Sequence, residues 1–387
     1  MEISNLQKSI LSRLRQQEID HNVHWLCNGQ PVFTKFQAMT NLSHGQPTSF
    51  YFFDQSWAQA DWSRASSTSF QDLLIERALQ IRRRYSYVRL AYSGGSDCHT
   101  ALMAFKMAGV APDEIYTYTM VGEAPALFND DFELLKGVFP FWSTLQQWFP
   151  NTKLQRLNID YDWYRAFKLL DVDHSAYEIS TGLRSLNTAG LLSLFDHMPL
   201  GPDICTVSGS DKPRLDYINN NWYVWFTDVG CCHAWGNSVE PFFQSADPAL
   251  FIKQAHMLKN FIKSQLPELT RKKIYQFQAQ GTIAMRQACN DALGRYRTFD
   301  PVVVSPKYSK QKFRVGERGL KAYCLWRKIR HLSGGPEFLS HWEQTKQDFK
   351  NRTGYCPTVE VFGKFYNLDT GEIHTVDDLF PRGWSLD

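Results

Sequence analysis

A short polar loop between a hydrophobic segment and a predicted helix contains the residues best suited to chemistry. The sequence reads Val88-Arg89-Leu90-Ala91-Tyr92 and continues as Ser93-Gly94-Gly95-Ser96-Asp97-Cys98-His99-Thr100. Two adjacent glycines let a backbone turn tightly and expose its N–H groups, and the start of a helix adds N–H groups with a partial positive charge. Together these groups form a cradle for phosphate. The alternative without a ligand is a Gly-Gly turn with an Asp helix cap.

Asp97 indicates that a metal ion takes part in this site. A carboxylate repels phosphate, so Asp97 fits a phosphate site only if a divalent cation, ordinarily Mg²⁺, lies between the two. The loop matches neither GxxxxGK[ST] nor GxGxxG, which excludes two common nucleotide-binding motifs. We expect Asp97 to be both a catalytic residue and the metal ligand. The residues expected to bind the nucleotide here are Ser93, Gly94, Gly95, Ser96, Asp97, Cys98 and Thr100.

A second polar loop, Ser208-Gly209-Ser210-Asp211-Lys212-Pro213-Arg214, follows another predicted strand. Ligands of parallel sheets sit at the carboxyl ends of the strands, so both loops are expected to face one phosphate-containing ligand. Lys212 and Arg214 supply positive charge where a reaction at phosphate develops negative charge, and we expect them to be catalytic. Ser208, Gly209 and Lys212 are expected to bind the nucleotide. The alternative is a plain surface turn.

The elements that must position these loops alternate between strand and helix. Apolar patterns predict strands at 86–92, 115–121, 153–159 and 203–208. They predict helices at 69–84, 97–108, 129–148, 161–170 and 182–195, the first capped by Ser69. This alternation predicts an α/β fold with a parallel sheet and helices on both faces. Thr119 and Val121, at the end of the second strand, are expected beside the base of a bound nucleotide, because apolar residues and free backbone groups suit base binding, although plain strand core explains them as well.

The remaining sequence is less regular. An amphipathic helix is predicted at the N-terminus and a strand at 49–53. Asn219-Asn220-Asn221 predicts a hairpin, and the rest is mostly helical, at 247–264, 270–293, 315–333 and 336–350, with a short hairpin at 359–373. We predict three parts: an N-terminal region (1–68), the nucleotide-binding domain (69–240) and a mostly helical C-terminal domain (241–387).

At Ser93–Asp97 the sequence resembles the PP-loop family, the N-type ATP pyrophosphatases, whose signature is SGGxD followed by Ser or Thr. Segment 69–121 is similar to the asparagine-synthetase-like branch of these adenine nucleotide α-hydrolase-like proteins, and to PP-loop proteins encoded by bacteriophages. The resemblance implies a HUP-type domain and cleavage of ATP between its α and β phosphates. It also implies that residues 93–97 hold pyrophosphate and Mg²⁺.

Cys98 departs from that signature, which has a hydroxyl residue at this position. A thiol is a weaker hydrogen-bond donor than a hydroxyl, and Thr100 or backbone N–H groups are expected to compensate. A helix N-terminus lowers the pKa of a thiol and raises its reactivity, so sulfur transfer by Cys98 is an alternative. We favour a thiol that replaces serine in packing.

Charge and composition limit the partners. Lys plus Arg number 42 against 39 Asp plus Glu, a net charge of +3, which excludes a global polyanion binder. Segment 301–330 carries nine Lys or Arg interleaved with aromatic residues, so it is either a nucleic-acid surface or a solvated basic face. Lys253, His256 and Lys259 share one face of a predicted helix, which is either solvated or lines the acceptor site.

The cysteine pattern and the hydropathy predict a cytoplasmic protein. No two of the eight cysteines have CxxC spacing, so the usual zinc and iron–sulfur signatures are missing. No apolar run approaches the ~18 residues that span a bilayer, and the N-terminus does not resemble a signal peptide. We therefore expect no membrane partner.

The resulting functional expectation is an AMP- and pyrophosphate-forming ligase. A substrate oxygen would be adenylated and then attacked by a nitrogen nucleophile. Residue 2 is Glu2 rather than the cysteine of a glutaminase, so nitrogen is expected from ammonia, from an amino group on the substrate or from a separate glutaminase. The alternatives are a PP-loop enzyme that modifies a nucleic-acid base or nucleotide by amidation, deazapurine formation or thiolation, and a degenerate, non-catalytic PP-loop protein.

Overall fold

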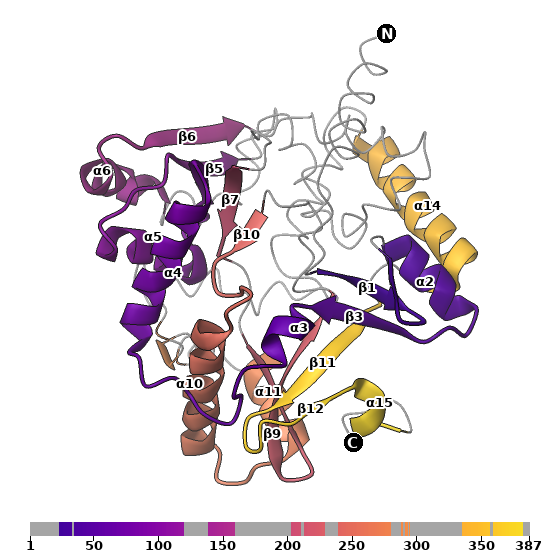
Figure 1. The fold of residues 1–387 in the computed structure, drawn as a ribbon. Coiled ribbons are helices and arrows are strands. Elements are labelled where there is room, and N and C mark those ends of the chain that lie inside the picture. The colour runs from indigo at the N-terminus through magenta and orange to yellow at the C-terminus, as the bar shows by residue number, and fades with distance from the viewer. Residues whose placement is uncertain are drawn as a thin grey trace.

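The computed structural model describes residues 23–32, 35–119, 138–158, 203–209, 213–228, 239–279, 288, 291–292, 294, 335–356 and 359–381 (Figure 1). These residues form three sheets. The strand orders are β2-β1-β3, β10-β7-β4-β5-β6 and β12-β11-β9-β8. None of the helices within these ranges is long and apolar enough to cross a membrane. The predicted helices at 161–170, 182–195 and 315–333, and the N-terminal one, lie outside the described residues.

The five-stranded sheet is parallel throughout. Its strands are β4 (Tyr87–Ala91), β5 (Glu114–Thr119), β6 (Lys153–Asn158), β7 (Ile204–Ser208) and β10 (Val239–Pro241). The chain starts at the central strand β4, builds outward through β5 and β6, and then returns to the other side of β4 as β7. The strand order therefore reverses between β4 and β7, which is where open α/β sheets bind ligands. The predicted parallel α/β core is confirmed.

Three helices share one hydrophobic core with this sheet. They are α4 (Phe70–Arg84), α5 (Ser96–Met107) and α6 (Phe139–Trp148). Ser69 caps α4, its hydroxyl accepting from the Asp72 N–H at 3.1 Å, and Leu74, Ala78 and Ile81 bury the apolar face. The predictions for 69–84 and 97–108 are confirmed to within a residue or two. Helices on the opposite face stay a prediction, because 120–137 and 159–202 are outside the described residues.

The predicted Asn hairpin is confirmed and belongs to a second sheet. Asn219 and Asn220 connect β8 (Arg214–Ile218) to β9 (Asn221–Thr227) with φ of 50° and 64°, conformations that asparagine tolerates well. β9 pairs with β11 (Phe362–Asn367), which pairs with β12 (Ile373–His374). Strands on both sides of the predicted boundary at 240 therefore share one sheet, and the C-terminal part contains strands as well as helices.

The outer edge of this sheet is covered by α11 (Arg271–Ala279). The side-chain amide of Gln278 pairs with the backbone of Leu215 in β8 as a neighbouring strand would. The Leu215 N–H donates to Oε1 at 3.0 Å, and Nε2 donates to the Leu215 carbonyl at 2.8 Å. Because both backbone groups of Leu215 find partners in this side chain, β8 cannot pair with another chain at this position.

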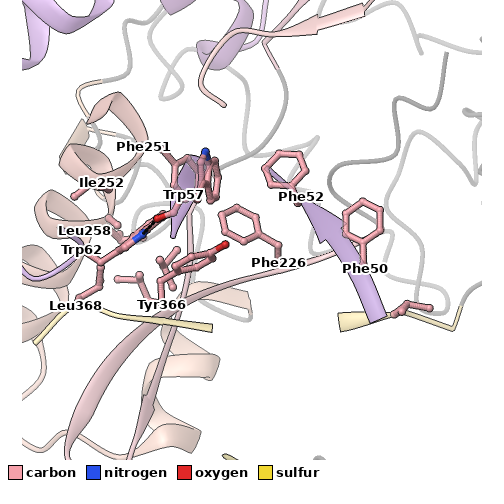
Figure 2. Close-up of a cluster of buried hydrophobic side chains, with 14 of the residues drawn as sticks. Phe50, Phe52, Trp57, Trp62, Phe226, Phe251, Ile252, Leu258, Tyr366 and Leu368 are labelled. Atoms are coloured by element: carbon pink, nitrogen blue, oxygen red, sulfur yellow. Dashed lines mark hydrogen bonds between the residues drawn. The ribbon is translucent and has the colours of Figure 1, made fainter. Parts of the chain in front are cut away.

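A second hydrophobic core joins the N-terminal sheet to the C-terminal elements. The elements that it adds are β1 (Val23–Cys27), β2 (Gln30–Val32), α2 (Lys35–Ser43), β3 (Thr48–Phe52), α3 (Asp54–Trp57), α10 (Ala249–Gln265) and α14 (Gly335–Thr353). The short helix α15 (Val376–Leu379) packs instead in a small cluster with Trp225 and Phe365. Figure 2 shows Trp57 and Phe226 between Phe52 on one side and Phe251 on the other. Since this core includes residues from all three predicted parts, the boundaries at 68 and 240 cut through it.

A buried ion pair lies where these elements meet. The Lys35 ammonium contacts Asp228 Oδ2, which also accepts from Trp25 Nε1 at 3.0 Å. Asp228 Oδ1 accepts from the Val361 N–H at 3.0 Å, and the Lys35 ammonium donates to the Val359 carbonyl at 2.6 Å. The side chains of Lys35 and Asp228 are only 5% and 1% exposed. Four separate segments are therefore tied together by one carboxylate and one ammonium.

Candidate functional site

The Ser93–Asp97 loop begins where the central strand β4 leaves the sheet. The Tyr92 N–H still donates to the Tyr116 carbonyl of β5, at 2.8 Å, and the Tyr92 ring is buried under α5. Gly94 then has a φ of 75°, in the left-handed region where glycine carries no steric penalty. Gly95 is the N-cap of α5 and Ser96 its first residue. The predicted order of strand, glycine turn and helix is confirmed.

The start of α5 presents N–H groups without a side-chain cap. Gly95 has no side chain to accept from the first turn, whereas Ser69 caps α4 in the same domain. The first N–H groups of a helix have no acceptor within the helix, and the helix dipole adds positive potential there. Ser93 is exposed beside this turn, and Asp97 is half-buried within it. The arrangement fits a phosphate group, with a carboxylate within the same turn for a metal ion.

The second predicted loop touches the first. β7 pairs with β4 in register, Leu90 opposite Val207, so both strands end at the same edge of the sheet. At Gly209 a Cβ atom would lie 2.6 Å from both the Cα and the N of Cys98. Only glycine permits this approach between the end of β7 and the first turn of α5. The structure therefore brings Ser208 and Gly209 to residues 93–98 at the reversal of strand order.

The thiol of Cys98 points into the loop. Its sulfur accepts from the Ser93 N–H at 3.3 Å, lies 3.3 Å from the Ser93 hydroxyl oxygen, and donates to the Gly95 carbonyl at 3.1 Å. Burial raises the pKa of Cys98, with smaller opposing effects from its hydrogen bonds to Ser93. The pKa of Cys98 is therefore raised and not lowered as expected for a helix N-terminus, because desolvation of the thiolate is the largest effect on it.

Thr100 does not fill the role predicted for it. The side chain is fully buried, and its hydroxyl donates to the Ser96 carbonyl at 2.6 Å. A hydroxyl has one hydrogen to donate, so Thr100 cannot compensate for the missing hydroxyl at position 98 while this bond is kept. The Ser93 hydroxyl and backbone N–H groups of the loop are then the donors expected for a phosphate.

Arg214 is the first residue of β8, in the second sheet. Pro213 is followed directly by β8, and the Arg214 guanidinium lies 3.3 Å from the Glu360 carboxylate and 5.4 Å from the centre of the Trp225 ring. Its charge is thus paired across β8, β9 and the residues before β11. The catalytic role of Arg214 stays a prediction, made for a guanidinium that lies 3.3 Å from the Glu360 carboxylate. Arg214 and Glu360 are 146 positions apart, so no residue near Arg214 in the sequence indicates this ion pair.

Several predicted residues have no described side chain. Thr119 ends β5, where its backbone pairs with Asn158, but its side chain lies outside the described residues, as do Val121, Lys212 and the whole basic segment 301–330. Their predicted roles therefore stay predictions. Among the described residues no three His, Cys, Asp or Glu side chains come together to hold a metal. A Mg²⁺ ion at the loop would rest on Asp97 and on oxygens of the bound phosphates.

The basic face of α10 proves structural. Lys253 donates to the Ser66 carbonyl at 2.8 Å, and His256 Nε2 lies 2.9 Å from the Trp62 carbonyl. Lys259 donates to the Leu368 carbonyl at 2.9 Å and to Asp369 at 2.6 Å. These side chains fasten α10 to the segments before α4 and after β11. Neither predicted alternative, a solvated face or an acceptor site, describes them.

A buried charged pair beneath the loop was not predicted. Arg89, in the middle of β4, is fully buried and donates to Glu114 Oε1 of β5 at 2.8 Å, with its guanidinium 4.5 Å from the centre of the Tyr116 ring. The other carboxylate oxygen accepts from the Tyr87 hydroxyl at 3.0 Å. An arginine between Val88 and Leu90 in an apolar strand is a sequence sign of such a pair. The pair joins the strand that carries the loop to its neighbour.

His99 is not a candidate acid or base. Burial lowers the pKa of His99 to about 4, and its Nδ1 lies 3.0 Å from the Tyr92 hydroxyl. The ring packs edge-on to Phe141 in the core below the loop. A buried imidazole with this pKa is neutral at pH 7, and it packs beneath the first turn of α5.

Comparison with known proteins adds no family to this geometry. No protein-family model matches the chain, and no curated protein matches it significantly.

Proposed function

We propose that this chain is an ATP pyrophosphatase of the PP-loop kind, with a HUP-type domain that cleaves ATP between the α and β phosphates. The observation that carries the proposal is the place of Ser93–Asp97, between β4 and an uncapped helix start, at the point where strand order reverses. The contact of Gly209 with Cys98 adds support, because it sets a second strand end against the same turn. Anions are stabilised at such helix starts.

Each group has a role in this proposal. The backbone of Gly94, Gly95 and the first turn of α5 holds the leaving pyrophosphate, and the exposed Ser93 hydroxyl donates to it. Asp97 binds Mg²⁺, which offsets the charge of the phosphate oxygens. Lys212 lies three residues beyond Gly209 and is assigned to the charge that develops at the α-phosphate. Attack by a substrate oxygen would release pyrophosphate and leave an adenylate for a nitrogen nucleophile.

The acceptor is assigned only by class. A small molecule or nucleotide is the first choice, with nitrogen from ammonia, from a substrate amine or from a separate glutaminase. A nucleic acid bound through 301–330 is the second choice. The proposal places the enzyme in the cytoplasm, where ATP is plentiful and where free thiols such as Cys98 and Cys205 stay reduced.

Calorimetry with inorganic pyrophosphate tests the site without knowledge of the acceptor. We expect one molecule of pyrophosphate to bind per chain, with Mg²⁺ required and with ATP as a competitor, because both ligands place a diphosphate on the same turn. Chelation of Mg²⁺ should abolish the heat of binding. Binding of neither pyrophosphate nor ATP by the folded protein would contradict the proposal and favour a degenerate loop.

A further inference from the structure

Cys98 stands at the contact between the two loops. Its side chain reaches Ser93 at the start of the first loop and Gly95 at its end, through contacts of 3.1 to 3.3 Å. Its backbone lies against Gly209 at the end of β7. The Cys98 thiol therefore contacts both Ser93 and Gly95, and the Cys98 backbone contacts Gly209 at the end of β7.

We propose that the Cys98 thiol and Gly209 are positioning groups for pyrophosphate, neither of which touches the ligand. Cys98 holds Ser93 and Gly95 in the curvature of the cradle, and Gly209 lets β7 support the first turn of α5 directly. This inference rests on the proposed function and assigns to these two residues a different role from direct nucleotide contact.

The weakness of sulfur as a hydrogen-bond acceptor suits this role. The Ser93 hydroxyl lies 3.3 Å from the sulfur, and Ser93 is an exposed residue beside the turn. Because sulfur is a weak acceptor, the Ser93 hydroxyl can exchange its hydrogen bond to the thiol for a stronger one to a phosphate oxygen at little cost in free energy. The thiol thus keeps the loop in shape when it is empty and does not compete with the ligand when it is bound.

The surroundings of the thiol oppose a covalent role. A sulfur carrier must reach its partner as a thiolate. The Cys98 side chain is buried and its hydrogen is donated to the Gly95 carbonyl. Burial raises the pKa of the thiol, which lowers the thiolate fraction at neutral pH. These contacts favour a thiol that positions Ser93 and Gly95 over a thiol that carries sulfur.

Alanine and serine substitutions at position 98 separate the roles. Calorimetry with Mg²⁺ and inorganic pyrophosphate is expected to give about tenfold weaker binding for Cys98→Ala, since two to three weak hydrogen bonds that shape the loop are lost. Cys98→Ser should bind within about threefold of the unchanged protein, because a hydroxyl supplies the same donor and acceptor. Cys205→Ala is the matched control, a fully buried thiol of β7 in the same core. It should lower the unfolding temperature and leave pyrophosphate affinity unchanged.

Gly209→Ala provides a second, independent variant. Its Cβ would meet backbone atoms of Cys98 at 2.6 Å, and backbone cannot move aside cheaply, so the first turn of α5 must shift. We expect at least about tenfold weaker binding. Gly363→Ala is the control for strain alone, because its Cβ would lie 3.0 Å from the Phe50 carbonyl in the other core.

The outcomes distinguish this inference from the proposed function. Unchanged pyrophosphate affinity in Cys98→Ala, with a lower unfolding temperature as in Cys205→Ala, would overturn the positioning role while the proposed function stands. Loss of ATP turnover in Cys98→Ser, with pyrophosphate binding intact, would overturn it in favour of thiol chemistry. Absence of pyrophosphate binding in the unchanged protein would overturn the proposed function itself.

Discussion

Asp97→Asn is expected to lower the rate of AMP formation from ATP by on the order of 100-fold or more, because the amide no longer holds Mg²⁺ against the phosphate charge. The fold should persist. Asp97 is half-buried in the first turn of α5, where replacing the carboxylate costs only about 0.3–1 kcal/mol of favourable interaction with the helix dipole. The measurements are the rate of AMP formation at saturating ATP and the unfolding temperature of the same sample.

Asp72→Asn is the matched control for this substitution. Asp72 occupies the first turn of α4, is exposed, and bonds to the cap residue Ser69. Its replacement should lower stability by a similar amount and leave the rate of AMP formation unchanged. If a folded Asp97→Asn protein retained the full rate, Asp97 would have no part in metal binding.

Asp228→Ala is expected to give the largest loss of stability, about 3–5 kcal/mol in the free energy of unfolding. The substitution leaves the Lys35 ammonium buried with no carboxylate, and it removes acceptors from Trp25 and from the Val361 N–H. Equilibrium denaturation in urea measures the change. The unfolding should affect the three-stranded and four-stranded sheets together, because the ion pair joins them.

A surface pair supplies the comparison. Glu268 and Lys273 are 2.5 Å apart, with side chains 66% and 47% exposed, so Glu268→Ala should cost no more than about 1 kcal/mol. The double substitution Lys35→Met with Asp228→Leu should recover much of the loss, since it removes both buried charges. A cost below 1 kcal/mol for Asp228→Ala would mean that Lys35 reaches water when its partner is gone.

The local part of the fold was readable from the sequence. Helix α4 carries a serine cap, a regular apolar face and a run of arginines at its end, and each of these acts within a few residues. The glycine turn of the loop and the Asn219–Asn220 hairpin are likewise local, because they depend on which residues tolerate a positive φ. The parallel sheet followed from the alternation of strand and helix.

The contacts that the prediction missed are long-range or depend on burial. Strand β9 pairs with β11, and Arg214 pairs with Glu360; both pairings join segments more than 100 residues apart. A single sequence does not show which residues of such distant segments lie opposite one another. The direction of the Cys98 pKa shift depends on desolvation, which the position at a helix start does not reveal. The hairpin of β1 and β2, with Asn28-Gly29 at its turn, has a recognisable turn signature, but its strands are too short for the alternation of apolar residues to show.

The identity of the nucleotide products tests the central claim most directly. The protein is incubated with Mg²⁺, ammonium as the nitrogen source and ATP labelled on the α-phosphate, with a deproteinised metabolite extract and bulk tRNA as separate acceptor pools, and the products are separated by chromatography. We predict AMP and pyrophosphate with at least one pool, and cleavage of β,γ-imido-ATP but not of α,β-methylene-ATP. Formation of ADP and phosphate, or cleavage of α,β-methylene-ATP, would contradict the account.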